Sequence, residues 1–297
     1  MDLIMHSTKS RPTLKPSLVF EAIGTSWSIE AEAALPQHVV HAIQNRIEAF
    51  DKTYSRFRED SLVSAMSRQK GLYTFPDDAQ DLFEFYEKLF ELTGGKVTPL
   101  IGGMLEKAGY DATYSFKARV QEDVPTLKDV MERHNSIVEV KVPVMIDVGA
   151  AGKGYLVDEV CLILDAAGIS EYVVDASGDM RHKGASVNKV GLEDPSDPTK
   201  VIGVIEVINQ SLCASASNRR RWGNEQHHIF DPDLKAPTNK IIATWAVADS
   251  TMIADGLATA LFFTDPQVLR AEFEYEYIRM HSNGAIDYSP AFEGKLF

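Results

Sequence analysis

The stretch IDVGAAGKGYLVDE, residues 146–159, decides the fold. In it, an apolar segment is followed by an aspartate, by small residues and then by an expected helix. Glycines beside a lysine at a helix start are typical of phosphate loops. The spacing departs from the Walker pattern G-x-x-x-x-G-K-[ST], since Asp147 replaces the first glycine and Gly154 replaces the hydroxyl residue. Two interpretations remain. Lys153 contacts an anion at the helix N-terminus, or the stretch is a strand-to-helix turn with packing glycines and a solvated lysine, which these residues alone favour.

The composition is that of a globular protein: 297 residues, 44% hydrophobic and 25% charged. A formal net charge of −13 argues against a nucleic-acid surface, which needs clustered Lys and Arg. An anionic ligand would need a local pocket of donors or a divalent metal. No run of about 18 apolar residues indicates membrane insertion.

The cellular compartment is predicted from two further features. Residues 1–17 lack the apolar core and cleavage site of a secretory signal. Cys161 and Cys213 lie far apart in apolar surroundings, which favours buried thiols over a disulfide. We therefore expect a cytoplasmic protein.

The chain is expected to form one α+β domain, residues 18–297, after a flexible tail of residues 1–17. Alternating residues predict strands at 18–33, with Trp27 and Ile29 on one face, and at 136–149, 171–179, 201–208, 211–216 and 241–248. Helical periodicity predicts helices from about residue 36, from 77 to 94, from 152 to 167, from about 250 and from Pro266. Because several strands are contiguous in sequence, a largely antiparallel sheet with helices on one side is expected.

The predicted helix at 77–94 carries an apolar stripe that is expected to face the core. Its members are Leu82, Phe85, Tyr86, Leu89 and Phe90. Such a stripe is more often core than ligand site.

Asp255 and Thr259 are four residues apart on a predicted helix, so their oxygens project from one face. A carboxylate and a hydroxyl suit Mg²⁺ or Ca²⁺. Taken alone, the pair is better explained by a threonine bonded to its own helix and a solvated aspartate, because Asp and Thr four residues apart are common.

The adjacent residues His227 and His228 precede the Asp231–Pro232 turn. One of them can point inward as an acid, a base or a ligand contact, because neighbours on an extended segment face opposite sides. No third ligand at zinc spacing is evident. A surface pair of histidines explains the segment equally well.

In order along the chain, these segments resemble the FAD:protein FMN transferase family, the ApbE proteins. The resemblance rests on IGTSWSIE (23–30), YSRFREDS (54–61), TGGKVTPLIGGML (93–105), DVGAAGKGYLVDE (147–159), VVDASGDMRHKG (173–184), VGLEDP (190–195), HHIFDP (227–232) and ADGLATALF (254–262). It implies an α+β fold related to the T-fold. It covers nearly the whole chain beyond residue 17.

The resemblance implies a divalent ion, Mg²⁺ with Ca²⁺ or Mn²⁺ as alternatives, that acts on the substrate FAD. Members move FMN onto a Ser or Thr hydroxyl of a partner flavoprotein and release AMP. The metal would be held by the Ala150 carbonyl, Asp255 and Thr259. The FAD contacts would be Ile23, Phe57, Lys96, Val97, Thr98, Asp147, Lys153 and His228. Either His228 or Asp255 would take the proton of the acceptor hydroxyl.

Two alternatives accompany this prediction. Some members of the family hydrolyse FAD to FMN and AMP instead. The chain also departs from the family at Thr98, where aspartate is usual, at Ala214 and Ala216, and at Leu234. A homologue that binds flavin without catalysis is therefore the third hypothesis.

Overall fold

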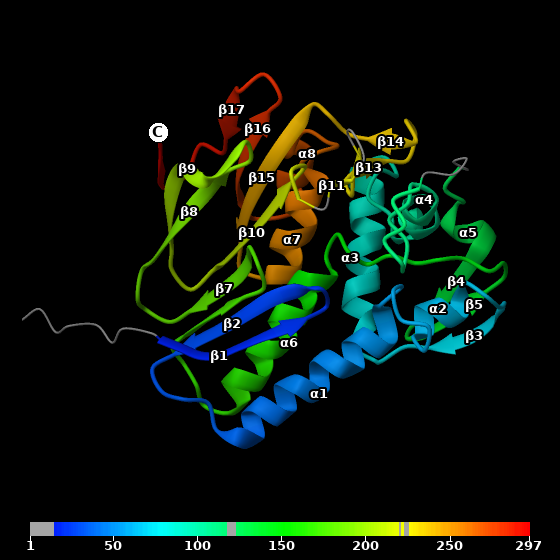
Figure 1. Cartoon of the computed structure of the whole chain (residues 1–297), viewed down its shortest axis with the longest axis horizontal. Coiled ribbons are helices and arrows are strands. Elements are labelled where there is room, and N and C mark those ends of the chain that lie inside the picture. Colours follow the sequence, from blue (N-terminus) through cyan, green and yellow to red (C-terminus); the bar gives the residue numbers. More distant parts are fainter. Residues whose placement is uncertain (1–14, 118–122, 220, 223–225) are drawn as a thin grey trace, which may run out of the picture.

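The computed structural model in Figure 1 describes residues 15–117, 123–219, 221–222 and 226–297. Every strand pairing in this part of the chain is antiparallel. Helices pack beside the sheets, so the predicted α+β class with a largely antiparallel architecture is confirmed.

The main sheet has eight strands in the order β1-β2-β6-β7-β10-β15-β16-β17. Their bounds are β1 Lys15–Ala22, β2 Thr25–Ala31, β6 Tyr172–Asp175, β7 Asp179–Lys183, β10 Ser211–Ala216, β15 Ile241–Ala248, β16 Glu276–His281 and β17 Ile286–Tyr288. A second sheet, β18-β9-β8, has three strands: β8 Asn188–Asp194, β9 Asp197–Val207 and β18 Gly294–Leu296.

The central strand β15 shows how the main sheet is covered on both faces. Ala246 and Ala248 belong to the large core, which includes helical residues. The alternate residues Trp245 and Val247 join Leu192 of β8 in a second apolar cluster. Alternation along the strand therefore turns small side chains toward the helices and larger ones toward the second sheet.

The long helices are α1 Gln37–Tyr54, α3 Ala79–Leu92, α6 Gly152–Ala166 and α7 Thr251–Ala260. The short ones are α2 Leu62–Met66, η1 Pro99–Ile101, α4 Gly102–Lys107, α5 Leu127–Val130 and α8 Pro266–Arg270. In Figure 1, α6 and α7 lie against the main sheet, with α1 crossing one end and α3 beside α7.

The remaining strands form a three-stranded sheet and two short ribbons. The sheet has the order β3-β5-β4, with β3 Gly71–Thr74, β4 Met131–His134 and β5 Ile137–Val140. One ribbon pairs β11 Arg221–Trp222 with β12 Gln226–His227, and the other pairs β13 Phe230–Asp231 with β14 Ala236–Pro237.

The structure corrects two details. The strand expected over residues 136–149 is only β5, because Pro143 cannot donate to a ladder. Burial still alternates beyond it, with Val144, Ile146 and Val148 all buried. Phe90, expected on the apolar stripe of α3, is 41% exposed because it lies at the edge of that stripe.

The expected boundaries can be compared only in part. Strand β1 begins at Lys15, inside the segment predicted as a tail, and residues 1–14 lie outside the described ones. Cys161 and Cys213 are buried with free thiols. Within the described ranges, no helix combines the length and apolar character needed to cross a bilayer.

Candidate active site

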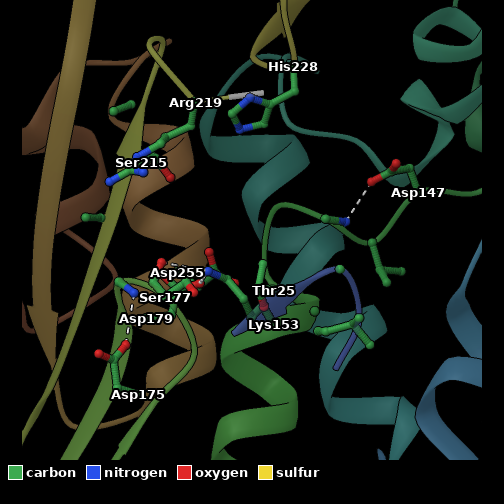
Figure 2. Close-up of a pocket in the computed structure, with 18 of the residues that line it drawn as sticks. Thr25, Asp147, Lys153, Asp175, Ser177, Asp179, Ser215, Arg219, His228 and Asp255 are labelled. Carbon is green, nitrogen blue, oxygen red and sulfur yellow. Dashed lines mark hydrogen bonds and ion pairs between the residues drawn. The ribbon is translucent and has the colours of Figure 1, made fainter. Parts of the chain in front are cut away.

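A cavity of about 1120 Å³ opens between the main sheet, the end of α1 and the turn that precedes α6. Its wall combines the β1–β2 turn, residues 54–58, the 147–153 segment, the β6–β7 turn, part of β8 and β10, His228 and Asp255. Figure 2 shows how Lys153, Asp179 and Asp255 gather at one end of it, with His228 and Asp147 further away.

Asp147 shapes the turn that leads into α6. Its Oδ1 accepts a hydrogen bond of 2.7 Å from the Gly149 N–H, which Figure 2 shows, and its Oδ2 pairs at 2.5 Å with Nε of Arg56. Arg56 is 4% exposed and also donates to the Tyr110 carbonyl. The Arg56–Asp147 pair is a feature of the site that the sequence interpretation missed.

Lys153, in the first turn of α6, is not a solvated lysine. Its Nζ lies 2.8 Å from Oδ2 of Asp179, which is 1% exposed, and donates to the Ala176 carbonyl at 2.7 Å. Ser177 and Gly178 take the left-handed conformation that lets the β6–β7 turn reach this lysine. The ammonium group is thereby fixed at the cavity wall.

Gly154 lets α6 and α7 touch. A Cβ atom there would lie 2.2 Å from the Thr251 carbonyl oxygen of α7. The Gly154 N–H donates to Oδ2 of Asp255 at 2.9 Å, and Asp255 is 4% exposed. The start of α6 therefore holds the carboxylate of α7.

The three predicted metal ligands belong to one small region. Thr259 Oγ1 donates to the Ala150 carbonyl at 3.4 Å, while the Gly154 N–H holds Asp255 one turn earlier on the same helix. The Ala150 N–H donates to the hydroxyl of Tyr86, whose pKa is raised well above its usual value by burial. A neutral Tyr86 thus positions the Ala150 peptide.

This donor set fits a hard cation. Carboxylate, hydroxyl and carbonyl oxygens are the ligands that Mg²⁺ and Ca²⁺ prefer. Within the described residues, no group of three or more His, Cys, Asp and Glu side chains is arranged to hold a metal ion. The region around Ala150 would therefore bind through mixed oxygen donors.

The two histidines face different surroundings, as expected of neighbours on an extended segment. His227 is 7% exposed and its Nε2 lies 2.9 Å from the Thr238 carbonyl. His228 lines the cavity. Only His228 is placed to contact a ligand there.

Lys96, Val97 and Thr98 lie away from the cavity wall as far as the described residues define it. The Lys96 ammonium pairs with Asp231 at 2.7 Å and with Asp233 at 2.5 Å. Val97 and Thr98 are buried. Lys96 thus joins the end of α3 to the β13–β14 ribbon, and the FAD contacts expected of these three residues remain predictions.

Ile23 and Phe57 do line the cavity. Ile23 has a φ of 44° in the tight β1–β2 turn. Phe57 belongs to an aromatic cluster, in which it stacks on Tyr114 and meets Tyr110 edge to face. Tyr110 in turn stacks on Trp222.

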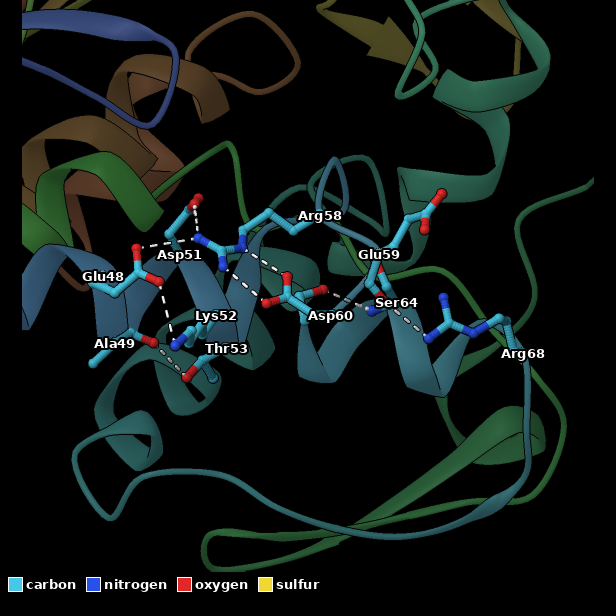
Figure 3. A network of polar contacts seen from close by, with 11 residues as sticks. Glu48, Ala49, Asp51, Lys52, Thr53, Arg58, Glu59, Asp60, Ser64 and Arg68 are labelled. Carbon is cyan, nitrogen blue, oxygen red and sulfur yellow. Dashed lines mark hydrogen bonds and ion pairs between the residues drawn. The ribbon is translucent and has the colours of Figure 1, made fainter.

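The Lys and Arg side chains of the described wall are all paired with carboxylates, some of which lie outside the wall. Arg58, at the rim, contacts the carboxylates of Glu48, Asp51 and Asp60 at 2.9 to 3.1 Å, as Figure 3 shows. Arg219 pairs with Glu193. The described part of the wall has six carboxylates and four Lys or Arg side chains, an excess of two negative charges.

The fold combines an eight-stranded antiparallel sheet, packed helices and a large cavity that Lys153 and Asp255 line. A family model described as "ApbE family" matches residues 23–278, and the chain belongs to that family.

Among similar proteins is an FAD:protein FMN transferase of Vibrio cholerae, 27% identical over 87% of this chain and 84% of that protein. Another, from Escherichia coli K12, is 20% identical over 87% of this chain and 81% of its own length. The ApbE protein of Thermotoga maritima has a similar fold, with a TM-score of 0.80, 24% identity and coverage of 94% of this chain and 97% of that one.

Proposed function

We propose that this protein is a Mg²⁺-dependent FAD:protein FMN transferase. Its relatives in Vibrio cholerae and Escherichia coli are FAD:protein FMN transferases, which supports this activity. The observation that carries the proposal is that Thr259 reaches the Ala150 carbonyl, while Asp255, one turn earlier on α7, is held by the Gly154 N–H and lines the large cavity.

The charge balance of the wall supports dependence on a cation. The pyrophosphate of FAD is an anion, and the cationic side chains Arg56, Arg58, Lys153 and Arg219 are already paired with carboxylates. A Mg²⁺ ion would supply charge neutralisation and Lewis acidity at the pyrophosphate. Ala150, Asp255 and Thr259 are the residues proposed to hold it, with Ca²⁺ or Mn²⁺ as substitutes.

The reaction would exchange the phosphoanhydride bond of FAD for a phosphoester bond to the acceptor. The acceptor hydroxyl oxygen of a Ser or Thr on a partner flavoprotein forms a bond to the FMN phosphorus. The bond from that phosphorus to the oxygen of AMP breaks, and AMP leaves. Asp255 accepts a hydrogen bond from the Gly154 N–H, so we assign His228, which lines the same cavity, to accept the hydroxyl proton. Lys153, whose ammonium group is fixed at the cavity wall, would contact the pyrophosphate.

The proposed location of the protein is the cytoplasm. Two buried free thiols, Cys161 and Cys213, support a reducing compartment.

The test is to incubate the protein with FAD and Mg²⁺, with and without a candidate acceptor domain, and to measure AMP and covalent flavin. We expect AMP release that EDTA abolishes, and covalent flavin on the acceptor. Asp255→Asn is expected to reduce AMP release by roughly 100-fold or more without lowering the melting temperature. Asp265→Asn, at the start of α8 and outside the described cavity wall, is the matched control.

Each other outcome has a distinct meaning. AMP release without covalent flavin on any acceptor would indicate FAD hydrolysis. FAD binding without AMP release would indicate a non-catalytic flavin-binding protein, a result that Ala214 and Ala216 on the cavity wall would help to explain. Unchanged activity of Asp255→Asn would contradict the metal assignment.

A further inference from the structure

A half-exposed tyrosine stands at the aromatic end of the cavity. Tyr114 is 48% exposed and lines the cavity wall. One face of its ring stacks on Phe57, with centroids 5.6 Å apart and planes tilted by 3°. Tyr110 and Phe116 approach at steeper angles. Tyr114 therefore keeps exposed surface at the cavity although Phe57 covers one face of its ring.

Phe57 itself has little ring face left for a ligand. The guanidinium carbon of Arg56 lies 4.2 Å from its centroid, and Tyr114 stacks on it. Arg56 is fixed in turn by Asp147 and by the Tyr110 carbonyl. The aromatic cluster thus presents Tyr114, rather than Phe57, as its outermost ring at the cavity.

The loop that carries Tyr114 is held in an unusual conformation. Tyr114 and Phe116 have φ values of 50° and 51°, which L-residues adopt only at an energetic cost. The Asp111 carboxylate accepts hydrogen bonds from the backbone and hydroxyl groups of Thr113 and Ser115. These bonds lower the pKa of Asp111, so the group that organises the loop stays ionised at neutral pH. The ring of Tyr114 is held in place before any ligand arrives.

We propose that Tyr114 is the stacking platform for a flat ring of the substrate, either the isoalloxazine or the adenine of FAD. This inference rests on the proposed function, since it assigns one end of FAD to the aromatic end of the cavity. Stacking on an aromatic side chain changes the affinity for a nucleobase by roughly 5- to 150-fold when that side chain is replaced by alanine. Tyr114 would make a contribution of that size.

The test compares Tyr114→Ala, Tyr114→Phe and the control Tyr288→Ala. Tyr288 is 51% exposed and pairs with one aromatic ring, Phe292, outside the described cavity wall. Dissociation constants for FAD and FMN are measured by flavin fluorescence, and those for AMP by calorimetry, all in buffer with Mg²⁺. Tyr114→Ala is expected to weaken FAD binding at least 5-fold, while Tyr114→Phe and Tyr288→Ala stay within 2-fold of the unsubstituted protein.

The affinities for the two shorter ligands, FMN and AMP, show which ring of FAD stacks on Tyr114. A matching loss for FMN but not for AMP assigns the isoalloxazine to Tyr114, and the reverse assigns the adenine. If Tyr114→Ala leaves all three affinities within 2-fold, or if Tyr288→Ala loses as much, the stacking site is overturned. FAD binding that depends on Tyr114 without any AMP release would instead overturn the proposed activity and leave the stacking site standing.

Discussion

At the scale of single residues, contacts in the site differ in how far sequence could predict them. Asp255 and Thr259 could be paired because helical spacing puts both on one face. The Arg56–Asp147 pair could not, because its partners are 91 residues apart and follow no periodicity. Lys153 illustrates the same limit, since its partner Asp179 lies on a distant turn.

Gly154 gives the first prediction at this scale. Gly154→Ala is expected to destabilise the protein by about 1–3 kcal/mol and to lower activity, because the new methyl group would collide with the Thr251 carbonyl and push α7 away. Gly103→Ala is the control, since a Cβ there meets open space on another helix. Denaturant titration of both variants checks the prediction, and equal stability of the two would contradict it.

His182 gives a prediction about pH. It is 1% exposed, its Nδ1 accepts the Asn209 N–H, and burial lowers its pKa below the usual value. The unfolded chain therefore binds this proton more readily than the folded protein does. The free energy of unfolding is expected to fall as pH drops from about 7 through the unfolded pKa of about 6.5, and to level off below the folded pKa.

The measurement is urea denaturation between pH 8 and pH 5. His182→Gln is expected to flatten the dependence, whereas His134→Gln, at an exposed position, should leave it unchanged. A slope that His182→Gln does not alter would exclude His182 as its source.

At the scale of elements, periodicity predicted the long helices α1, α3, α6 and α7 well, because a stripe of apolar residues must face the core. The helices α2, α4 and α5 were missed, since they are too short to show such a stripe. The strand pattern at residues 136–149 was misleading, since alternating burial continues along a segment that Pro143 keeps out of any ladder. The two-residue strands of the ribbons β11–β12 and β13–β14 are too short to carry a period.

The start of helix α7 gives the prediction for this scale. The Asp158 carboxylate accepts hydrogen bonds from the backbone of Thr251 and Met252 and from the hydroxyl of Ser250. It therefore joins α6 to the N-terminus of the helix that bears the proposed metal ligands. Asp158→Ala is expected to lower the free energy of unfolding by about 1–2 kcal/mol and also to weaken Mg²⁺-dependent activity.

Asp265→Ala provides the comparison, because Asp265 is the N-cap residue of α8, accepts a hydrogen bond from the Gln267 N–H and lies outside the described cavity wall. The Asp265→Ala substitution should lower the free energy of unfolding by a similar amount and leave activity intact. Thermal unfolding and Mg²⁺ titration of AMP release separate the two effects. Full Mg²⁺ affinity in Asp158→Ala would show that this cap does not position the site.

At the scale of the whole molecule, net charge could be predicted from sequence, but the cavity could not. Its wall takes residues from Ile23 to Asp255, and only the packing of sheets and helices brings them together. The family resemblance supplied Ala150, because a backbone carbonyl has no sequence signature of its own.

The net charge of −13 gives a prediction about FAD association. Repulsion between the acidic protein and anionic FAD is screened by salt, so the association rate constant should rise severalfold between about 20 and 200 mM salt at fixed Mg²⁺. Stopped-flow fluorescence measures it, with neutral riboflavin as the control. A rate that falls with salt would indicate a locally positive entrance.

The wide spread of the cavity wall along the chain also affects the order of events during protein synthesis. A chain still attached to the ribosome has made the β1–β2 turn and the α6 turn long before α7, which carries Asp255, emerges. Until then the ligand has no complete surface to bind. The substrate can therefore stabilise only the finished molecule and cannot assist the folding of its first half.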